Sequence, residues 1–188
     1  KVAIYSTCYV NYNEPGIGHD LLKVLDHNEI PYVLVEKEKC CGMPKLELGD
    51  LDSVNTSKEA NIPVLVKYAK DGFAILSAVP SCTLMFKQEL PLMYPGDADV
   101  QQVKDAMWDP FEYLMQRKRD GLLKTEFTQP LGKISYQIPC HGRVQNIGKK
   151  TEEMFKLVPA TWVQTNERCS GHAGTFGVKK ATHQQAMK

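Results

Sequence analysis

Short apolar runs alternate with amphipathic runs along most of this chain. The apolar runs predict strands at residues 2–6, 31–35, 73–78, 133–138 and 161–164. Apolar residues at helical spacing predict helices at residues 18–27, 57–70, 83–90, 100–119 and 149–157, with Pro110 interrupting the fourth. Strands that alternate with helices are typical of a parallel sheet with right-handed crossovers. The predicted fold class is therefore α/β.

The positions of the cysteines indicate an internal repeat. Cys8 and Cys140 each follow a predicted strand, and Cys40 and Cys169 each follow the next strand in their half of the chain. We therefore predict two similar Rossmann-like lobes with short parallel sheets, related by a pseudo-two-fold axis. The expected boundaries are 1–125 for the first lobe and 126–188 for the second, which we expect to be truncated at its C-terminus.

Composition narrows the class of protein. The chain has 188 residues, 43% apolar and 24% charged, with a net charge of +1, as in an ordinary globular protein. This charge gives no reason to expect a nucleic-acid partner. No apolar run is long enough to span a membrane. The six cysteines lie at strand ends rather than at the spacings of a disulfide scaffold, so we expect them to be reduced and the protein to be cytoplasmic, with peripheral attachment to the inner face of the membrane left open.

The first four cysteines are the strongest chemical signal. Cys8, Cys40, Cys41 and Cys82 fall at or beyond the carboxyl ends of predicted parallel strands, the edge at which α/β sheets bind ligands. Adjacent cysteines rarely form a disulfide with each other. Soft sulfur ligands select zinc or an iron–sulfur cluster, so we predict a cofactor-binding site formed by these four residues. The alternative is that they are small core residues, since free cysteine is often buried.

The second half carries a weaker version of this pattern. Ser170 stands where the first half has Cys41, so only Cys140 and Cys169 remain there. His141 and His172 lie near them and would complete a Cys2His2 zinc site. A second cluster is the other reading, and histidines that only form hydrogen bonds in a loop are the third.

Two further expectations concern single positions. Trp108 and Trp162 are interpreted as core residues because of their size. The charged run 36–39, directly before the adjacent cysteines, is interpreted as a solvent-exposed approach to the site.

Three segments carry a resemblance to a known family. They are Cys8 with the Tyr-Val-Asn-Tyr-Asn that follows it, Lys-Glu-Lys-Cys-Cys-Gly-Met-Pro at 37–44, and Pro-Ser-Cys-Thr-Leu-Met at 80–85. They resemble the cysteine-rich "CCG" domain that occurs in iron–sulfur components of heterodisulfide reductases, glycolate oxidases and anaerobic glycerol-3-phosphate dehydrogenases, and the likeness to the last is strongest. Residues 139–141 and 169–180 extend it into the second repeat.

The resemblance implies an electron-transfer component with a non-cubane [4Fe–4S] cluster at the first repeat, on Cys8, Cys40, Cys41 and Cys82. Val79 stands where the family has a further cysteine, which puts a five-cysteine site in doubt. Related chains often carry a ferredoxin-like segment with two further clusters, so we expect this sequence to be a piece of a longer chain.

The predicted function is an iron–sulfur subunit of an oxidoreductase complex. It would relay electrons between a flavin dehydrogenase, or another redox subunit, and a quinone or disulfide acceptor. The main alternative is a non-redox zinc module that serves structure or assembly. A thiol–disulfide enzyme that uses Cys40 and Cys41 is the third reading, and it would need an exposed thiol of low pKa.

Overall fold

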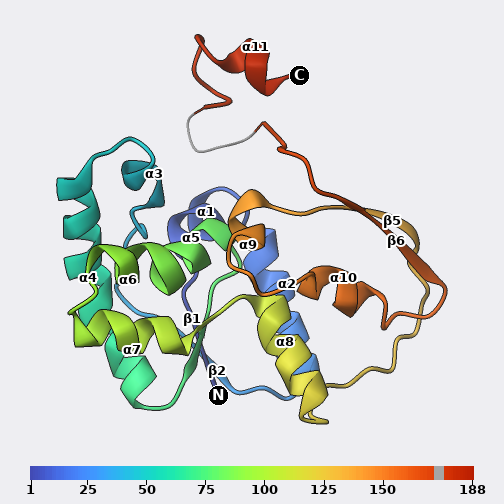
Figure 1. Ribbon diagram of the computed structural model, residues 1–188. Helices are drawn as coiled ribbons and strands as arrows, with labels where there is room; N and C mark the ends of the chain where they lie inside the picture. Colours follow the sequence, from blue (N-terminus) through green and yellow to red (C-terminus); the bar gives the residue numbers. More distant parts are fainter. Residues whose placement is uncertain (172–175) are drawn as a thin grey trace.

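A four-stranded parallel sheet forms the centre of the molecule, in the computed structural model that describes residues 1–171 and 176–188 (Figure 1). Its strands lie in the order β2-β1-β3-β4. Their bounds are Val2–Ile4 for β1, Tyr32–Leu34 for β2, Ala74–Leu76 for β3 and Met107–Trp108 for β4. The predicted α/β class with short parallel sheets is confirmed.

The first and third strands are buried on both faces, and their side chains alternate between two hydrophobic clusters. Ala3 and Ile75 point into one cluster, and Val2, Ile4 and Leu76 point into the other. This alternation follows from the two-residue period of a strand. Near-continuous apolar runs are the expected signature of such doubly covered strands, and this is why the sequence pattern located them correctly.

Helices cover both faces of the sheet. The helices α4 (Leu51–Lys70) and α7 (Ala98–Ala106) supply residues to the first cluster. The helices α2 (Pro15–His27) and α8 (Pro110–Arg119) supply residues to the second. The sheet is thus the middle layer of three, and its carboxyl edge is left to loops and short helices.

The predicted helix over 100–119 is wrong in one respect, because it is two helices with a strand between them. Met107, 1% exposed, pairs with Ile75 and adds the strand β4 to the sheet. Pro110 then begins α8, and Asp109 caps it in a capping box with Glu112. Two residues are too few to show the alternation of a strand. Because the residues on either side have the spacing of an amphipathic helix, the sequence pattern predicted one continuous helix.

Other boundaries shift by a few residues. The helix α4 begins at Leu51, capped by the Asp50 side chain, and it continues through Pro63. The predicted helix at 83–90 is part of a longer run made of α5 (Pro80–Leu84), a π-helical segment (Met85–Glu89) and α6 (Leu90–Met93). Within it the Leu90 N–H donates to the Met85 carbonyl, the wider π pattern.

The second half of the chain forms a separate, smaller sheet. Its strands β5 (Gly132–Gln137) and β6 (Thr161–Asn166) pair in parallel. The described part of the second half also contains the helices α9 (Cys140–Arg143), α10 (Lys150–Phe155) and α11 (His183–Ala186). The two-lobe repeat is not confirmed, because β5 and β6 match only the β1–β2 pair of the first sheet. The division at residues 125 and 126 stays a prediction.

Phe155 of α10 connects the small sheet to the larger one. Its ring lies 6.5 Å from that of Tyr136 in β5 and 6.4 Å from that of Phe111 in α8. The packing covers the inner face of the small sheet. Its outer face leaves Trp162 64% exposed, so the interpretation of Trp162 as a core residue is wrong. Trp108 does pack against the second hydrophobic cluster.

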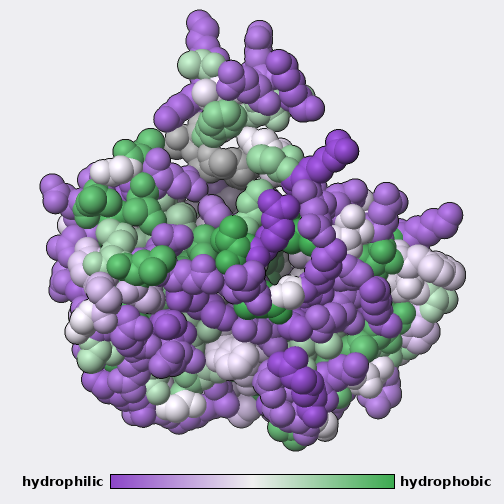
Figure 2. Space-filling model, in the orientation of Figure 1, coloured by the Kyte–Doolittle hydropathy of each residue, from purple (hydrophilic) through white to green (hydrophobic). Residues whose placement is uncertain are grey.

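The surface is mainly hydrophilic in the view of Figure 2, where hydrophobic groups form separate patches. Among the residues that the structure describes, no helix combines the length and the apolar character needed to cross a membrane.

Replacement of Leu65 by Ala should lower the free energy of unfolding by about 2–5 kcal/mol, because it leaves a cavity in the first hydrophobic cluster. Leu65 is 0% exposed. Replacement of Trp162 by Ala is the control and should change stability by no more than about 0.5 kcal/mol. Urea unfolding followed by circular dichroism measures both. A larger loss from the Trp162 variant would contradict the assignment of the outer face.

Candidate functional site

Three segments bring four cysteines to the carboxyl edge of the larger sheet. Cys8 lies in the short helix α1 (Thr7–Tyr12), which follows β1. Cys40 and Cys41 lie in the loop between β2 and the short helix α3 (Met43–Leu46), and Cys82 lies in α5, which follows β3. Since β1 pairs in parallel with both β2 and β3, all three segments start from the same edge.

The four thiols form a line of neighbours. Cys8 interacts with Cys40, Cys40 with Cys41, and Cys41 with Cys82. Exposure falls along the line: Cys8 is exposed, Cys40 is half-buried, and Cys41 and Cys82 are 3% and 4% exposed. The sulfurs are therefore gathered rather than scattered in the core, with one end of the line open to solvent.

Burial and mutual contact hold the thiols of Cys8, Cys40 and Cys41 in the protonated form when nothing is bound. Burial, followed by the neighbouring Cys40, raises the pKa of Cys8. The contact with Cys41, followed by burial, raises the pKa of Cys40. Contact with Cys40 lowers the pKa of Cys41, but contact with Cys82 together with burial outweighs this and raises it. Each thiol would have to lose a proton to bind a metal.

Hydrogen bonds from buried side chains fix the loop that carries the adjacent cysteines. Asn61, 1% exposed in α4, accepts from the Lys39 N–H at 2.9 Å and donates to the Cys40 carbonyl at 3.1 Å. The hydroxyl of Tyr5, at the end of β1, donates to the Lys39 carbonyl. Burial, followed by the neighbouring Cys41 and Cys82, raises the pKa of Tyr5, so it remains a donor.

Gly42 is required by the turn that follows the two cysteines. Its φ is +95°, and a Cβ there would lie 3.2 Å from the Cβ of Ser57 in α4. A side chain at this position would meet both the backbone restriction and the neighbouring helix. The glycine of the motif thus lets the cysteine loop pack closely on α4.

Glu38 contradicts the interpretation of residues 36–39 as a solvent-exposed run. Its carboxylate is partly buried and accepts hydrogen bonds from the chain next to Cys8, while Glu36, Lys37 and Lys39 are exposed. Sequence reasoning missed Glu38, Asn61 and Tyr5 as residues that build the site. The only sequence signal for Glu38 was its place two residues before Cys40.

The second predicted site is only partly described. Cys140 begins α9 and Cys169 follows β6, and both are exposed. His141 lies with its Nε2 3.7 Å from Oε1 of Glu47, near α3. His172 lies outside the described residues, so the Cys2His2 site stays a prediction. The helix α9 packs on α5, where Gln145 donates to the Pro80 carbonyl at 3.1 Å, so Cys140 and Cys82 lie in neighbouring helices.

Over residues 1–171 and 176–188, no group of three or more His, Cys, Asp or Glu side chains is arranged to hold a single metal ion. A tetrahedral zinc site would place four sulfurs about 2.3 Å from one point. The thiols interact in pairs, Cys8 with Cys40, Cys40 with Cys41 and Cys41 with Cys82, and a centre with several metal atoms, each bound to its own thiolate, would suit such pairs. The donor set, four sulfurs and no charged nitrogen, fits an iron–sulfur cluster.

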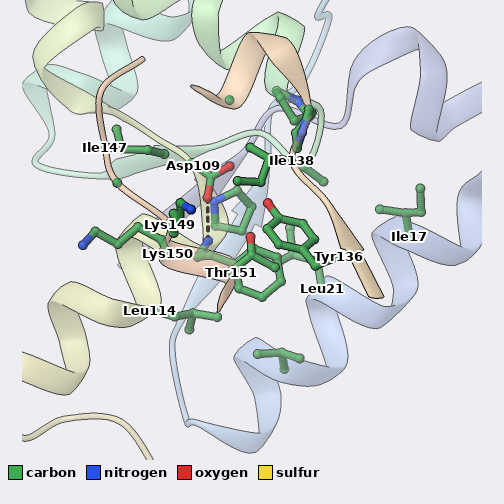
Figure 3. A pocket seen from close by; sticks show the side chains of 18 of the residues that line it. Ile17, Leu21, Asp109, Leu114, Tyr136, Ile138, Ile147, Lys149, Lys150 and Thr151 are labelled. Carbon is green, nitrogen blue, oxygen red and sulfur yellow. Dashed lines mark hydrogen bonds between the residues drawn. The ribbon is translucent and has the colours of Figure 1, made fainter. Parts of the chain in front are cut away.

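A cavity of about 440 Å³ lies between the helices α2 and α8 and the segment 136–151. Figure 3 shows Ile17 and Leu21 of α2 on one side of it and Ile147 on the other, with the Tyr136 ring between. Its lining is mainly apolar, and Lys149 and Lys150 at its margin pair with Glu167 and Glu153. Pro80, the first residue of the helix that carries Cys82, also lines it.

The sequence pattern of a known family matches the part of the chain that holds the four sulfurs. Residues 2–87 match the cysteine-rich domain named CCG. The resemblance predicted from the cysteine motifs is therefore confirmed. The match ends five residues beyond Cys82, so it includes every residue of the line described above.

Several curated relatives match almost the whole chain. The anaerobic glycerol-3-phosphate dehydrogenase of Escherichia coli K12 has a subunit that is 29% identical over 97% of this chain and 46% of its own length. An uncharacterized iron-sulfur protein of Methanocaldococcus jannaschii is 28% identical over 93% of this chain and 32% of its own. The fumarate reductase (CoM/CoB) of Methanothermobacter marburgensis has a subunit that is 25% identical over 95% of this chain and 34% of its own length.

The chain spans 32–46% of the length of these three relatives. No solved structure matches it significantly.

Metal uptake by the reduced apoprotein should strengthen as pH rises. The raised pKa values of Cys8, Cys40 and Cys41 mean that protons must be released on binding, so affinity increases with pH while the thiols remain protonated. Each proton displaced contributes about tenfold in affinity per pH unit. Cadmium titration between pH 6 and 8, followed by thiolate absorbance, measures this. An affinity independent of pH would contradict the assignment of these thiols.

Proposed function

Because residues 2–87 match the cysteine-rich domain named CCG, we propose that this chain is the iron–sulfur electron-transfer part of an oxidoreductase complex. Cys8, Cys40, Cys41 and Cys82 would hold the cluster. The observation that carries the proposal is the line of four neighbouring thiols from three loops at one sheet edge. An iron–sulfur cluster supplies reversible electron transfer, with a potential set by the hydrogen bonds and solvent around its sulfurs.

The protein's own contribution is to hold the ligands and to control access to them. Cys41 and Cys82 are both part of the first hydrophobic cluster. They would anchor the iron–sulfur centre among these buried side chains. Exposed Cys8 would leave one side near the surface, where a redox partner can approach. The chain therefore offers a buried anchor and an accessible edge.

A zinc module is the weaker alternative. It would need the four sulfurs around one point, and among residues 1–171 and 176–188 no three His, Cys, Asp or Glu side chains are arranged to hold one metal ion. A thiol–disulfide enzyme is weaker still, since it needs a low-pKa thiolate and the pKa values of Cys8, Cys40 and Cys41 are all raised.

The partners belong to the same proposal. The names of the Escherichia coli and Methanothermobacter relatives describe subunits, so we expect this chain also to work beside other redox subunits. A flavin dehydrogenase is the donor that we propose. A quinone or a disulfide would be the acceptor, and a ferredoxin-like segment in the full-length protein would extend the relay.

The apolar cavity is our candidate for a quinone site. Its volume of about 440 Å³ and apolar lining suit a small aromatic molecule. Pro80 lines it and lies two residues before Cys82 in the same helix, so a molecule bound there would lie close to the sulfur site.

Replacement of Cys41 by Ser should remove most of the iron, to less than about a third of the wild-type content, because a hydroxyl is a poor ligand for this centre. Anaerobic iron and sulfide analysis with paramagnetic resonance measures this. Cys169→Ser is the matched control and should retain the signal of the first site. Equal iron in wild type and Cys41→Ser, or a colourless protein with stoichiometric zinc, would contradict the proposal.

Replacement of Ile17 by Trp should block the cavity and weaken the binding of menadione, a small naphthoquinone, by about tenfold or more, which corresponds to about 1.4 kcal/mol. Lys23→Trp, on the same helix but outside the cavity, is the control and should bind as wild type does. Equilibrium dialysis measures both. Undiminished binding to Ile17→Trp would exclude the cavity as the quinone site without affecting the cluster assignment.

A further inference from the structure

The residue before Cys8 has an unfavourable backbone conformation. Thr7 has a φ of +74°, a value that β-branched residues rarely adopt, and it is 1% exposed. This conformation turns the chain from β1 into α1 and so directs the Cys8 side chain. A strained turn of this kind persists only where its surroundings hold it.

The Glu38 carboxylate holds this turn. Its Oε2 accepts from the Ser6 N–H at 2.8 Å, and its Oε1 accepts from the Thr7 N–H at 3.1 Å and from the Asn11 side-chain amide at 3.0 Å. Both oxygens are thus engaged by donors from the segment around Cys8. Hydrogen bonds to a charged acceptor are stronger than those between neutral groups.

Glu38 is itself attached to a fixed segment. The next residue, Lys39, donates its N–H to Asn61 and accepts at its carbonyl from Tyr5, and the Cys40 carbonyl accepts from Asn61. The carboxylate therefore joins the turn before Cys8 to the segment that carries Cys40. The two sulfurs are neighbours although 32 residues separate Cys8 from Cys40.

We propose that Glu38 is a positioning residue that holds the sulfur of Cys8 against that of Cys40. It is not a metal ligand, since its oxygens are used by backbone and amide donors. Where it concerns the cluster, the inference rests on the proposed function: by fixing one ligand, Glu38 would set the geometry and the potential of the centre. Its effect on the two thiols can be measured without any cluster.

Glu38→Gln is the informative variant. A glutamine has one acceptor oxygen, so it cannot accept from both backbone N–H groups through separate oxygens as the carboxylate does. Glu36→Gln removes the same charge two residues earlier, from an exposed position outside this network, and is the matched control. Glu38→Asp retains a carboxylate one methylene shorter, and it serves as the test variant should Glu38→Gln fail to fold.

The first experiment uses the reduced apoprotein and the oxidant diamide. Diamide takes two electrons and two protons from a pair of thiols, which become a disulfide. We expect the Cys8–Cys40 disulfide, quantified by peptide mass spectrometry, to form about five- to tenfold more slowly in Glu38→Gln, because the thiols are less often in contact. Loss of a nearby negative charge alone would lower the thiol pKa and speed the reaction. An unchanged or faster rate would overturn the proposal.

The second experiment tests the strained turn directly. Glycine adopts a positive φ without cost, so Thr7→Gly should make the turn less dependent on Glu38. We expect the double variant Thr7→Gly/Glu38→Gln to recover at least about half of the lost rate, and Thr7→Gly alone to react about as wild type does. The absence of rescue would mean that Glu38 acts by another route and would overturn its role in holding this turn.

The third experiment uses the iron-loaded protein. We expect Glu38→Gln to shift the paramagnetic resonance spectrum and the reduction potential, with Glu36→Gln unchanged. Identical spectra and potentials for Glu38→Gln and wild type would overturn the effect on the centre. If the wild type binds no iron, the proposed function fails, whereas the diamide rates still decide whether Glu38 positions Cys8.

Discussion

The parallel pairing of β1 with both β2 and β3 is the constraint on which the site depends. Ile4 is opposite Leu34 on one side and Leu76 on the other, so three strands end at the same level. The segments that follow them carry Cys8, the adjacent cysteines and Cys82. A slip of one strand by one residue would reverse its buried face, and the apolar side chains in both hydrophobic clusters oppose such a slip.

Convergence at one edge places the cysteines near each other, but it does not orient them. Orientation comes from polar side chains that are themselves buried, as Asn61 is, or partly buried, as Glu38 is. Asn61 holds the backbone on both sides of the Lys39–Cys40 peptide bond, and Glu38 holds the backbone before Cys8. Their contacts are to backbone groups and, for Glu38, also to the Asn11 side-chain amide, so they can fix the loops without competing for a metal. The strain at Thr7, about 1–3 kcal/mol in such turns, is offset by these bonds.

The sequence was sufficient for the features that depend on local pattern. It located β1 and β3 because apolar runs mark buried strands, and it also located β2, an apolar run although Val33 and Leu34 are exposed. It predicted that the four cysteines lie at one edge because parallel strands end together. It failed where structure depends on contacts distant in sequence. Two residues of β4 carry no period of their own, and the hydrogen bonds of Glu38 reach across 31 and 32 residues to the chain before Cys8. Glu38 lies in a run of four charged residues, and nothing in the sequence of that run indicates that its carboxylate binds the backbone before Cys8.

The two halves of the chain differ in how deeply their cysteine thiols are buried, and burial would help a site to hold an iron–sulfur cluster. Both place a cysteine after the first and the second strand of a parallel pair. In the first half a third strand and α4 bury the neighbouring thiols, and Cys41 and Cys82 are nearly inaccessible. In the second half β5 has β6 as its only partner in the described chain, and Cys140 and Cys169 are exposed. Burial limits solvent access and strengthens hydrogen bonds to sulfur, so we expect the similar placement of cysteines after strands to carry different chemistry in the two halves.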